Sequence, residues 1–390
     1  MSTKDLQEVK DRIKGEAERR YDQALMLSHL IHENPELGFE EYKAHDWMAA
    51  AISDLGMDLN DHAGGLRTAF TGDAGGAPLK IGICAEYDAL PGVGHACGHN
   101  VIAACAYLAT AALVPFLDEI GVSIRILGTP AEEGGGGKVL MLEQGAFKHL
   151  NAAMMVHPAP AESDRMPTLA AKHLDITFVG KEAHASGYPQ VGINALDAMT
   201  ISQVAIGLQR QHNYPYDQVH GFVSHGGDAP NVIPALVEGT YIIRSKTLSD
   251  LELLEPKINR CFEAGAHATG ASLNITSPSP AYSEFITDEE IAAIYRRQAE
   301  ACGRPFPDPT REFRASTDMA NISLEIPSIH PLLDINSLPA INHQPEFTRA
   351  ARSAAADKAV FEGALSMAYT ILEIAADQSL SKRLMSHSCR

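Results

Sequence analysis

The sequence predicts an α/β fold built on a mainly parallel sheet, with a smaller α+β domain inserted into it. The chain has 390 residues, and because a domain usually takes about 100–200 residues, two domains are expected. Up to residue 156, short apolar runs alternate with helical stretches, as in a sheet covered by helices. From residue 173 the run HLDITFVG alternates apolar and polar residues, which indicates a half-exposed strand. Residues 1–169 and 281–390 are therefore assigned to the first domain, and residues 170–280 to the insertion.

The elements of the first domain follow from its apolar runs. Residues 1–20 alternate charges and predict a solvent-exposed helix. The run KIGICA is apolar after its lysine, as expected of a strand covered on both faces. Asn100 can cap an Ala-rich helix that follows. The expected elements are strands at 80–85, 122–127 and 152–156 and helices at 100–117 and 138–144.

The inserted domain shows a different order of elements. Strands are expected at 173–180, 218–224, 236–247 and 272–277, and helices at 195–210 and 250–268. This β-α-β-β-α-β order is that of the ferredoxin-like unit. The Pro-containing stretch SPSPAYSEF, residues 277–285, reads as a return linker, after which helix and strand patterns resume and should rejoin the first sheet.

Composition excludes several classes of partner. The net charge of -18 would repel nucleic acid and anionic lipid. The longest apolar stretch, residues 101–117, is shorter than the roughly 20 residues of a membrane span, so a buried helix is expected there. The N-terminus lacks the apolar segment of a signal peptide, and the six cysteines show no framework spacing, so we expect a cytoplasmic location without disulfides.

Polar side chains that can bind metals follow the predicted parallel strands. The first strand is followed by Glu86, Asp88 and the run HACGHN at 95–100, the second by Glu132 and Glu133, and the third by His157. Ligands of open α/β sheets bind beyond the carboxyl ends of the strands. Thiolate, imidazole and carboxylate are ligands of zinc and related divalent ions. The placement of these side chains after neighbouring strands predicts that they form a single metal site.

Each motif alone has a simpler reading. A lone Cys or His, as in Cys97-Gly98-His99, is more often a packing residue, and adjacent glutamates often begin a solvated helix. His157 could simply end a strand. The run of four glycines before Lys138 suggests a phosphate loop, but the Walker pattern requires a glycine where Glu132 stands and Ser or Thr where Val139 stands. A nucleotide site is therefore excluded.

Motifs along nearly the whole chain resemble the M20 family of metallopeptidases and amidohydrolases, in the branch of aminobenzoyl-glutamate hydrolase and the aminoacylase-1-like β-alanyl-dipeptidases. The resemblance rests on eight segments in family order. They are HENPELGFEE from His32, EYDALPGVGHACGHN from Glu86, TPAEEGGGGK from Thr129, MMVHP from Met154, GKEAHASGYP from Gly180, NVIP from Asn231, STDMANIS from Ser316 and INHQPEFT from Ile341.

The resemblance implies a catalytic α/β domain with an inserted dimerisation lid and two divalent metal ions per subunit, zinc or manganese. It implies Glu132 as general base and Asp88 as the carboxylate that orients an imidazole ligand. Glu86 and Asn100 depart from the wider family, which has a metal-binding His and an Asp at these positions. The implied metal ligands are Cys97, which would bridge the two ions, His99, Glu133, His157 and His343.

In the lid, the resemblance implies that His184 and Asn231 stabilise the oxyanion, with His184 supplied by the partner subunit of a homodimer. Arg244 matches a position that often holds a substrate carboxylate, although a lone strand Arg is as often part of a surface ion pair. His330 is a candidate for lining the substrate pocket, with an ordinary loop histidine as the alternative.

The expected activity is hydrolysis of the amide bond of a small molecule, such as an N-acyl amino acid, an aminobenzoyl-glutamate-like amide or a dipeptide. Two alternatives remain open at this point. One is hydrolytic removal of an aromatic amine at the same site, and the other is a binding protein that has kept the fold and lost catalysis.

Overall fold

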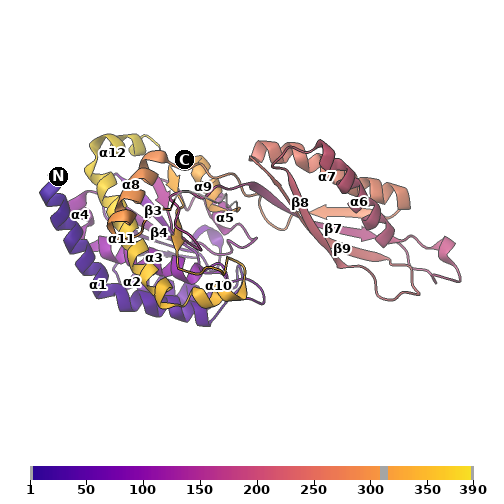
Figure 1. Ribbon diagram of the computed structural model, residues 1–390, viewed down its shortest axis with the longest axis horizontal. Helices are drawn as coiled ribbons and strands as arrows, with labels where there is room; N and C mark the ends of the chain where they lie inside the picture. Colours follow the sequence, from indigo (N-terminus) through magenta and orange to yellow (C-terminus); the bar gives the residue numbers. More distant parts are fainter. Residues whose placement is uncertain (1–2, 308–314, 388–390) are drawn as a thin grey trace. The chain divides into compact units, whose positions relative to one another are not determined.

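The computed structural model describes residues 3–307 and 315–387, which form two compact units (Figure 1). Unit 1 comprises Met1–Pro167 and Phe285–Arg390, and unit 2 comprises Thr168–Glu284. The expected boundaries, after residues 169 and 280, lie two and four residues from these.

Unit 1 contains a six-stranded sheet in the order β1-β2-β4-β3-β5-β11. The neighbours β4-β3, β3-β5 and β5-β11 are parallel, whereas β1 and β2 add an antiparallel edge. The prediction of a mainly parallel sheet is confirmed, but the two edge strands were not anticipated. The strands are β1 (Asp58–Asp61), β2 (Phe70–Ala74), β3 (Lys80–Ala85), β4 (Ser123–Gly128), β5 (Ala152–Met154) and β11 (Ser328–Ile329), and a separate parallel pair is formed by β6 (His157–Ala159) and β12 (Leu332–Asp334).

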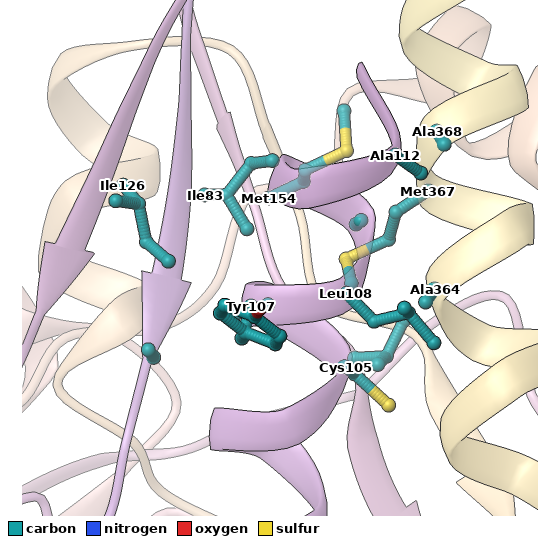
Figure 2. Packing of buried hydrophobic residues seen from close by; sticks show 14 of the residues in the cluster. Ile83, Cys105, Tyr107, Leu108, Ala112, Ile126, Met154, Ala364, Met367 and Ala368 are labelled. Carbon is teal, nitrogen blue, oxygen red and sulfur yellow. The ribbon is translucent and has the colours of Figure 1, made fainter. Parts of the chain in front are cut away.

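The helices of unit 1 enclose a core centred on α3. All fifteen residues of α3 are buried, and the helix contacts β3, α1 and α11. Figure 2 shows Tyr107 of α3 facing the strands that carry Ile83 and Ile126, while Leu108 lies toward Met367 of α11. The helices are α1 (Thr3–Glu33), α2 (Tyr42–Ser53), α3 (His99–Leu113), α4 (Leu117–Ile120), α5 (Gly137–Glu143), α8 (Glu289–Ala301), α9 (Met319–Glu325), α10 (Pro345–Ala350), α11 (Ala354–Ala376) and α12 (Gln378–Met385).

Two helical stretches of unit 1, His99–Ile120 and Ala354–Ala376, are long and apolar enough to cross a membrane by length and composition alone. Most of each stretch is buried inside the protein, as in the core helix of a globular domain.

Three local expectations were wrong. Helix α1 is not simply solvated, because Val9, Ile13 and Ala17 at spacings of four residues are buried in the core. Asn100 does not cap α3, since the cap is Gly98 and the buried Asn100 amide instead donates to Ser28 Oγ and the Ala351 carbonyl. The third strand ends at Met154, and His157, expected just beyond it, begins β6.

Unit 2 is an antiparallel sheet in the order β10-β7-β9-β8. Helices α6 and α7 both contact β7 and β9. This strand order with two helices is the ferredoxin-like arrangement that the order of elements predicted. The elements are β7 (Ala170–Val179), α6 (Ala195–Gln209), β8 (Gln218–His225), β9 (Leu236–Ser245), α7 (Leu248–Thr269) and β10 (Ser272–Thr276).

Candidate metal centre

The polar residues that follow the parallel strands of unit 1 meet in one cluster, which is largely buried apart from the exposed His343. Each strand end supplies its part, because the carboxyl ends of parallel strands lie at the same sheet edge. The members are Glu86 and Asp88 after β3, Cys97 and His99 at the start of α3, Glu132 and Glu133 after β4, His157 in β6, and His343 before α10.

Two groups of potential ligand atoms share the thiol of Cys97. One contains Cys97, His99 and His157, and the other contains Cys97, Glu133 and His343, with the ligand atoms of each group within 4.8 Å of one another. Cys97 Sγ lies 3.6 Å from His157 Nε2 and 3.5 Å from His343 Nε2, and His343 Nε2 lies 3.5 Å from Glu133 Oε1. Donors on one tetrahedral zinc ion, at about 2.0–2.3 Å from the metal, are separated by about 3.3–3.6 Å. The spacing therefore fits two metal ions bridged by Cys97.

Ionisation of the Cys97 thiol also depends on a cation. Burial raises the pKa of Cys97 well above its usual value, and the nearby Glu133 adds to this effect. A buried thiol of this kind stays protonated unless a metal ion replaces its proton. Two further buried atoms, His99 Nε2 and Glu133 Oε1, have no hydrogen-bond partner within the described residues, as expected of atoms reserved for a ligand.

Asp88 connects the two groups. Its Oδ1 lies 2.9 Å from His99 Nδ1, and its Oδ2 accepts a hydrogen bond of 2.9 Å from the Glu133 backbone N–H. Because a proton on Nδ1 faces the carboxylate, Nε2 of His99 presents its lone pair to the cluster. Asp88 thus has the contacts of a residue that orients one ligand and fixes the backbone of another.

The backbone at the cluster adopts conformations that suit few residues. Gly98, between Cys97 and His99, has φ of +79°, and a Cβ there would lie 2.9 Å from Pro158 Cβ. His343 has φ of 70°, and its N–H donates to the Ala96 carbonyl at 2.8 Å. Left-handed backbone in a non-glycine residue costs free energy and is frequent at functional sites.

Glu132 is buried at 6% exposure, and its Oε2 lies 3.8 Å from His99 Nε2. Burial raises the pKa of Glu132 well above its usual value, and the carboxylates of Glu86 and Glu133 raise it further. A carboxyl group in such surroundings binds a proton more readily than a solvated glutamate does, which is the property of a general base and acid.

His330 is also part of this region. Its ring is buried and lies edge-to-face against His157, with centroids 5.6 Å apart. Neither of its nitrogens has a hydrogen-bond partner within the described residues, so it is not an ordinary satisfied loop histidine. Burial lowers the pKa of His330 well below its usual value, and His157 lowers it further, so the ring is neutral.

The remaining predicted site residues belong to unit 2. Nδ1 of the exposed His184 accepts a hydrogen bond of 3.0 Å from the Gly187 N–H, which leaves Nε2 as the donor. Its neighbour Ala185 donates to the Asn231 carbonyl at 2.9 Å, so His184 and Asn231 lie on paired segments. Arg244 on β9 is half-buried, and burial lowers its pKa.

Sequence reasoning missed the role of Lys138. The structure buries its side chain completely, with Nζ 2.5 Å from Glu86 Oε1 and 2.8 Å from Asp318 Oδ1. Two of the four glycines before it are required by close packing, because a Cβ would lie 2.6 Å from Ala131 Cβ at Gly135 and 1.9 Å from the Pro130 carbonyl oxygen at Gly137. The only local signal was a lysine in an apolar stretch, and its partner Asp318 is 180 residues away.

Comparison with known proteins identifies the family of the chain. The family model "Peptidase family M20/M25/M40" matches residues 82–366. The Xaa-Arg dipeptidase of Mus musculus is 34% identical over 384 residues, covering 93% of this chain and 89% of the relative. A p-aminobenzoyl-glutamate hydrolase chain of Escherichia coli (strain K12) is 30% identical over 282 residues, covering 67% of this chain and 58% of the relative.

Solved structures show the same fold. An aminobenzoyl-glutamate utilization protein from Klebsiella pneumoniae has a TM-score of 0.71 at 15% identity, covering 93% of this chain and 98% of that chain. A dinuclear metal-binding M20 peptidase from Bacillus subtilis has a TM-score of 0.62 at 19% identity, covering 91% and 99%. With its family match and its relatives, the chain belongs to peptidase family M20/M25/M40, whose members hydrolyse peptide and amide bonds with the help of metal ions.

Proposed function

We propose that the protein is a di-metal amidohydrolase that cleaves the amide bond of a dipeptide, an N-acyl amino acid or an aminobenzoyl-glutamate-like amide. The observation that carries the proposal is the pair of ligand groups that share the buried Cys97, with Glu132 beside them. Thiolate and imidazole favour zinc, while the carboxylate of Glu133 also suits manganese, so both metals are candidates.

When bound, the two ions would supply an activated water molecule and polarise the amide carbonyl. Glu132 would accept the proton of the attacking water and then deliver it to the leaving amine, which makes the carboxyl both base and acid. Asp88 would hold His99 in the tautomer that leaves Nε2 free. The neutral His330, buried beside His157, would contact the substrate.

The proposed homodimer rests on the exposed apolar surface of unit 2. On α6, Ile201, Val204 and Leu208 are 37%, 59% and 72% exposed and share one helix face. Phe222 on the edge strand β8 is 62% exposed. An edge strand beside an apolar helix face is a typical self-association surface. In such a dimer we propose that His184 Nε2 and the Asn231 amide donate to the oxyanion, with His184 supplied from the partner subunit.

The substrate class is proposed from the relatives and from Arg244. The mouse and human relatives are named Xaa-Arg dipeptidases, and the Escherichia coli relative is named for aminobenzoyl-glutamate. Both kinds of substrate end in an α-carboxylate, which a guanidinium can hold through two hydrogen bonds. We assign that role to Arg244. The five free cysteines in the described part of the chain support the proposed cytoplasmic location.

The decisive experiment measures amine release from a panel of Xaa-Arg and Xaa-Lys dipeptides, aminobenzoyl-glutamate and hippurate. Wild type and Glu132→Ala are compared, with bound metal counted in each. We expect one substrate class to be cleaved by wild type, and a loss of about 100-fold or more in the variant at unchanged metal content. Retained activity in Glu132→Ala would refute the assignment of the base. Release of free ammonia would favour the deaminase, and wild type with neither metal nor turnover would favour the inactive binder.

The dimer is tested by Leu208→Asp and by the control Leu253→Asp, which alters a leucine that is 59% exposed on α7 instead of α6. We expect Leu208→Asp alone to shift sedimentation toward the monomer and to lose turnover. A monomeric variant with full activity would contradict a role of His184 across the interface.

A further inference from the structure

A buried ion cluster lies against the candidate metal centre and has no role in the mechanism above. It consists of Glu86, Lys138 and Asp318, whose side chains are all fully buried. Lys138 comes from the first turn of α5, Glu86 follows β3, and Asp318 precedes α9. Burying a charged triad is costly, and replacing it with apolar residues is often neutral or stabilising. Stability alone therefore does not explain it.

The carboxylate of Glu86 is within reach of a metal ion held by His99. Its Oε2 lies 3.4 Å from His99 Nε2, the nitrogen that faces the cluster. This separation is that of two donors on one tetrahedral ion, about 3.3 Å for nitrogen and oxygen. Ligand atoms of Glu86, His99 and Glu132 also lie within 4.8 Å of one another. Glu86 is thus a carboxylate that could bind the ion in addition to the ligands already described.

Lys138 competes for that carboxylate. Its ammonium lies 2.5 Å from Glu86 Oε1, whereas the other oxygen, Oε2, is the one near His99. Asp318 fixes the lysine at two points, because Oδ1 accepts from Nζ and Oδ2 accepts from the Lys138 backbone N–H, each at 2.8 Å. Burial lowers the pKa of Lys138, but Asp318 and Glu86 more than offset this, so the lysine is charged.

We propose that Lys138 keeps Glu86 off the metal ion, so that the ion retains an open coordination position for water and substrate. Catalytic zinc sites have three protein ligands and one open position, whereas structural sites are closed by a fourth. Cys97, His99 and His157 would supply three donors to one ion. A free Glu86 would be the fourth and would convert a catalytic site into a structural one. The inference rests on the proposed di-metal function.

The test uses Lys138→Met, which removes the charge at similar length, in the full-length protein loaded with cobalt(II). If Glu86 is released onto the ion, a carboxylate replaces water in the fourth position, so the visible absorption bands of cobalt should shift from those of wild type and metal affinity should rise by about tenfold or more. Turnover should fall by a similar factor. In the double variant Lys138→Met/Glu86→Gln the spectrum should return to that of wild type, because this variant has the net charge of wild type and no carboxylate to bind.

An unchanged cobalt spectrum in Lys138→Met, or weaker metal binding, would overturn the proposal, since both indicate a merely structural lysine. If Lys138→Met does not fold, the cobalt spectrum of the single variant Glu86→Gln tests the proposal. Its cobalt spectrum should match wild type if Lys138 holds Glu86 away, and a changed spectrum would mean that Glu86 is already a ligand. Wild type is measured in parallel, and its failure to bind cobalt would refute the di-metal function instead.

Discussion

The stability of the protein should depend on pH through Glu41, a fully buried carboxyl group at the start of α2. Its Oε2 accepts a hydrogen bond from Thr68 Oγ1 and its Oε1 accepts one from the Ala131 N–H, both at 2.7 Å. Burial, followed by the charge of Asp88, raises the pKa of Glu41 from 4.5 to about 7. Glu41→Gln keeps the shape and both contacts, since the amide can accept from Ala131 and donate to Thr68.

The magnitude follows from linkage between protonation and folding. The folded protein favours the neutral carboxyl, so its contribution is fully present below pH 4.5 and is lost as the pH rises to about 7. The difference between these pKa values corresponds to about 3 kcal/mol. Glutamine is neutral throughout. The free energy of unfolding of Glu41→Gln should therefore gain about 3 kcal/mol relative to wild type between pH 4.5 and pH 8.

The assay is urea denaturation of both proteins at several pH values and a fixed metal concentration. Ser28→Ala serves as control, because it removes a buried hydroxyl that accepts a hydrogen bond from Asn100 and carries no charge. The decrease in the free energy of unfolding caused by Ser28→Ala should be the same at every pH. A difference between Glu41→Gln and wild type that does not vary with pH would refute the buried, proton-binding carboxyl.

Two further predictions concern buried carboxylates. In Asp88→Asn the side chain cannot accept hydrogen bonds from both His99 and the Glu133 N–H, so the variant should lose a charge-assisted hydrogen bond of about 1.5–3 kcal/mol. Metal binding, measured by chelator competition, should weaken about 10- to 100-fold. An unchanged metal affinity would exclude the orienting role of Asp88. Arg304→Met leaves the buried carboxylate of Glu162 without its guanidinium partner, so the free energy of unfolding measured by urea denaturation should fall by about 3–5 kcal/mol. Much of this loss should be recovered in Arg304→Met/Glu162→Gln. Equal losses in the two variants would argue against a charge effect.

Those parts of the fold and of the candidate site that depend on the order of the strands and on local sequence pattern could be predicted from the sequence. Glu86, Glu132 and His157 were expected to meet because each follows a strand of one parallel sheet. The buried face of α1 was also visible in principle, since Val9, Ile13 and Ala17 repeat at helical spacing, but the abundant charges on its other face obscured it.

Other features depend on contacts between distant segments or on backbone that only the folded chain reveals. His343 lies on an exposed loop and itself has a left-handed backbone conformation. No periodicity in the sequence distinguishes this residue, so only the family resemblance predicted it as a ligand. The start of α3 was misplaced because Gly98, not Asn100, provides the cap. Lys138 and Asp318 pair across 180 residues, and a buried lysine cannot be distinguished from an exposed one by its neighbours in sequence.

The complete burial of α3 also has a consequence for biosynthesis. The helix that carries His99 is covered partly by α1, which is made before it, and partly by α11, whose residues 354–376 are made more than 200 residues after it. Until α11 has left the ribosome, the apolar stretch His99–Ile120, which is long enough to span a membrane, lacks the part of its cover that α11 supplies. Nascent chains should therefore depend on chaperones late in translation, and fragments that end before residue 354 should be degraded or aggregate.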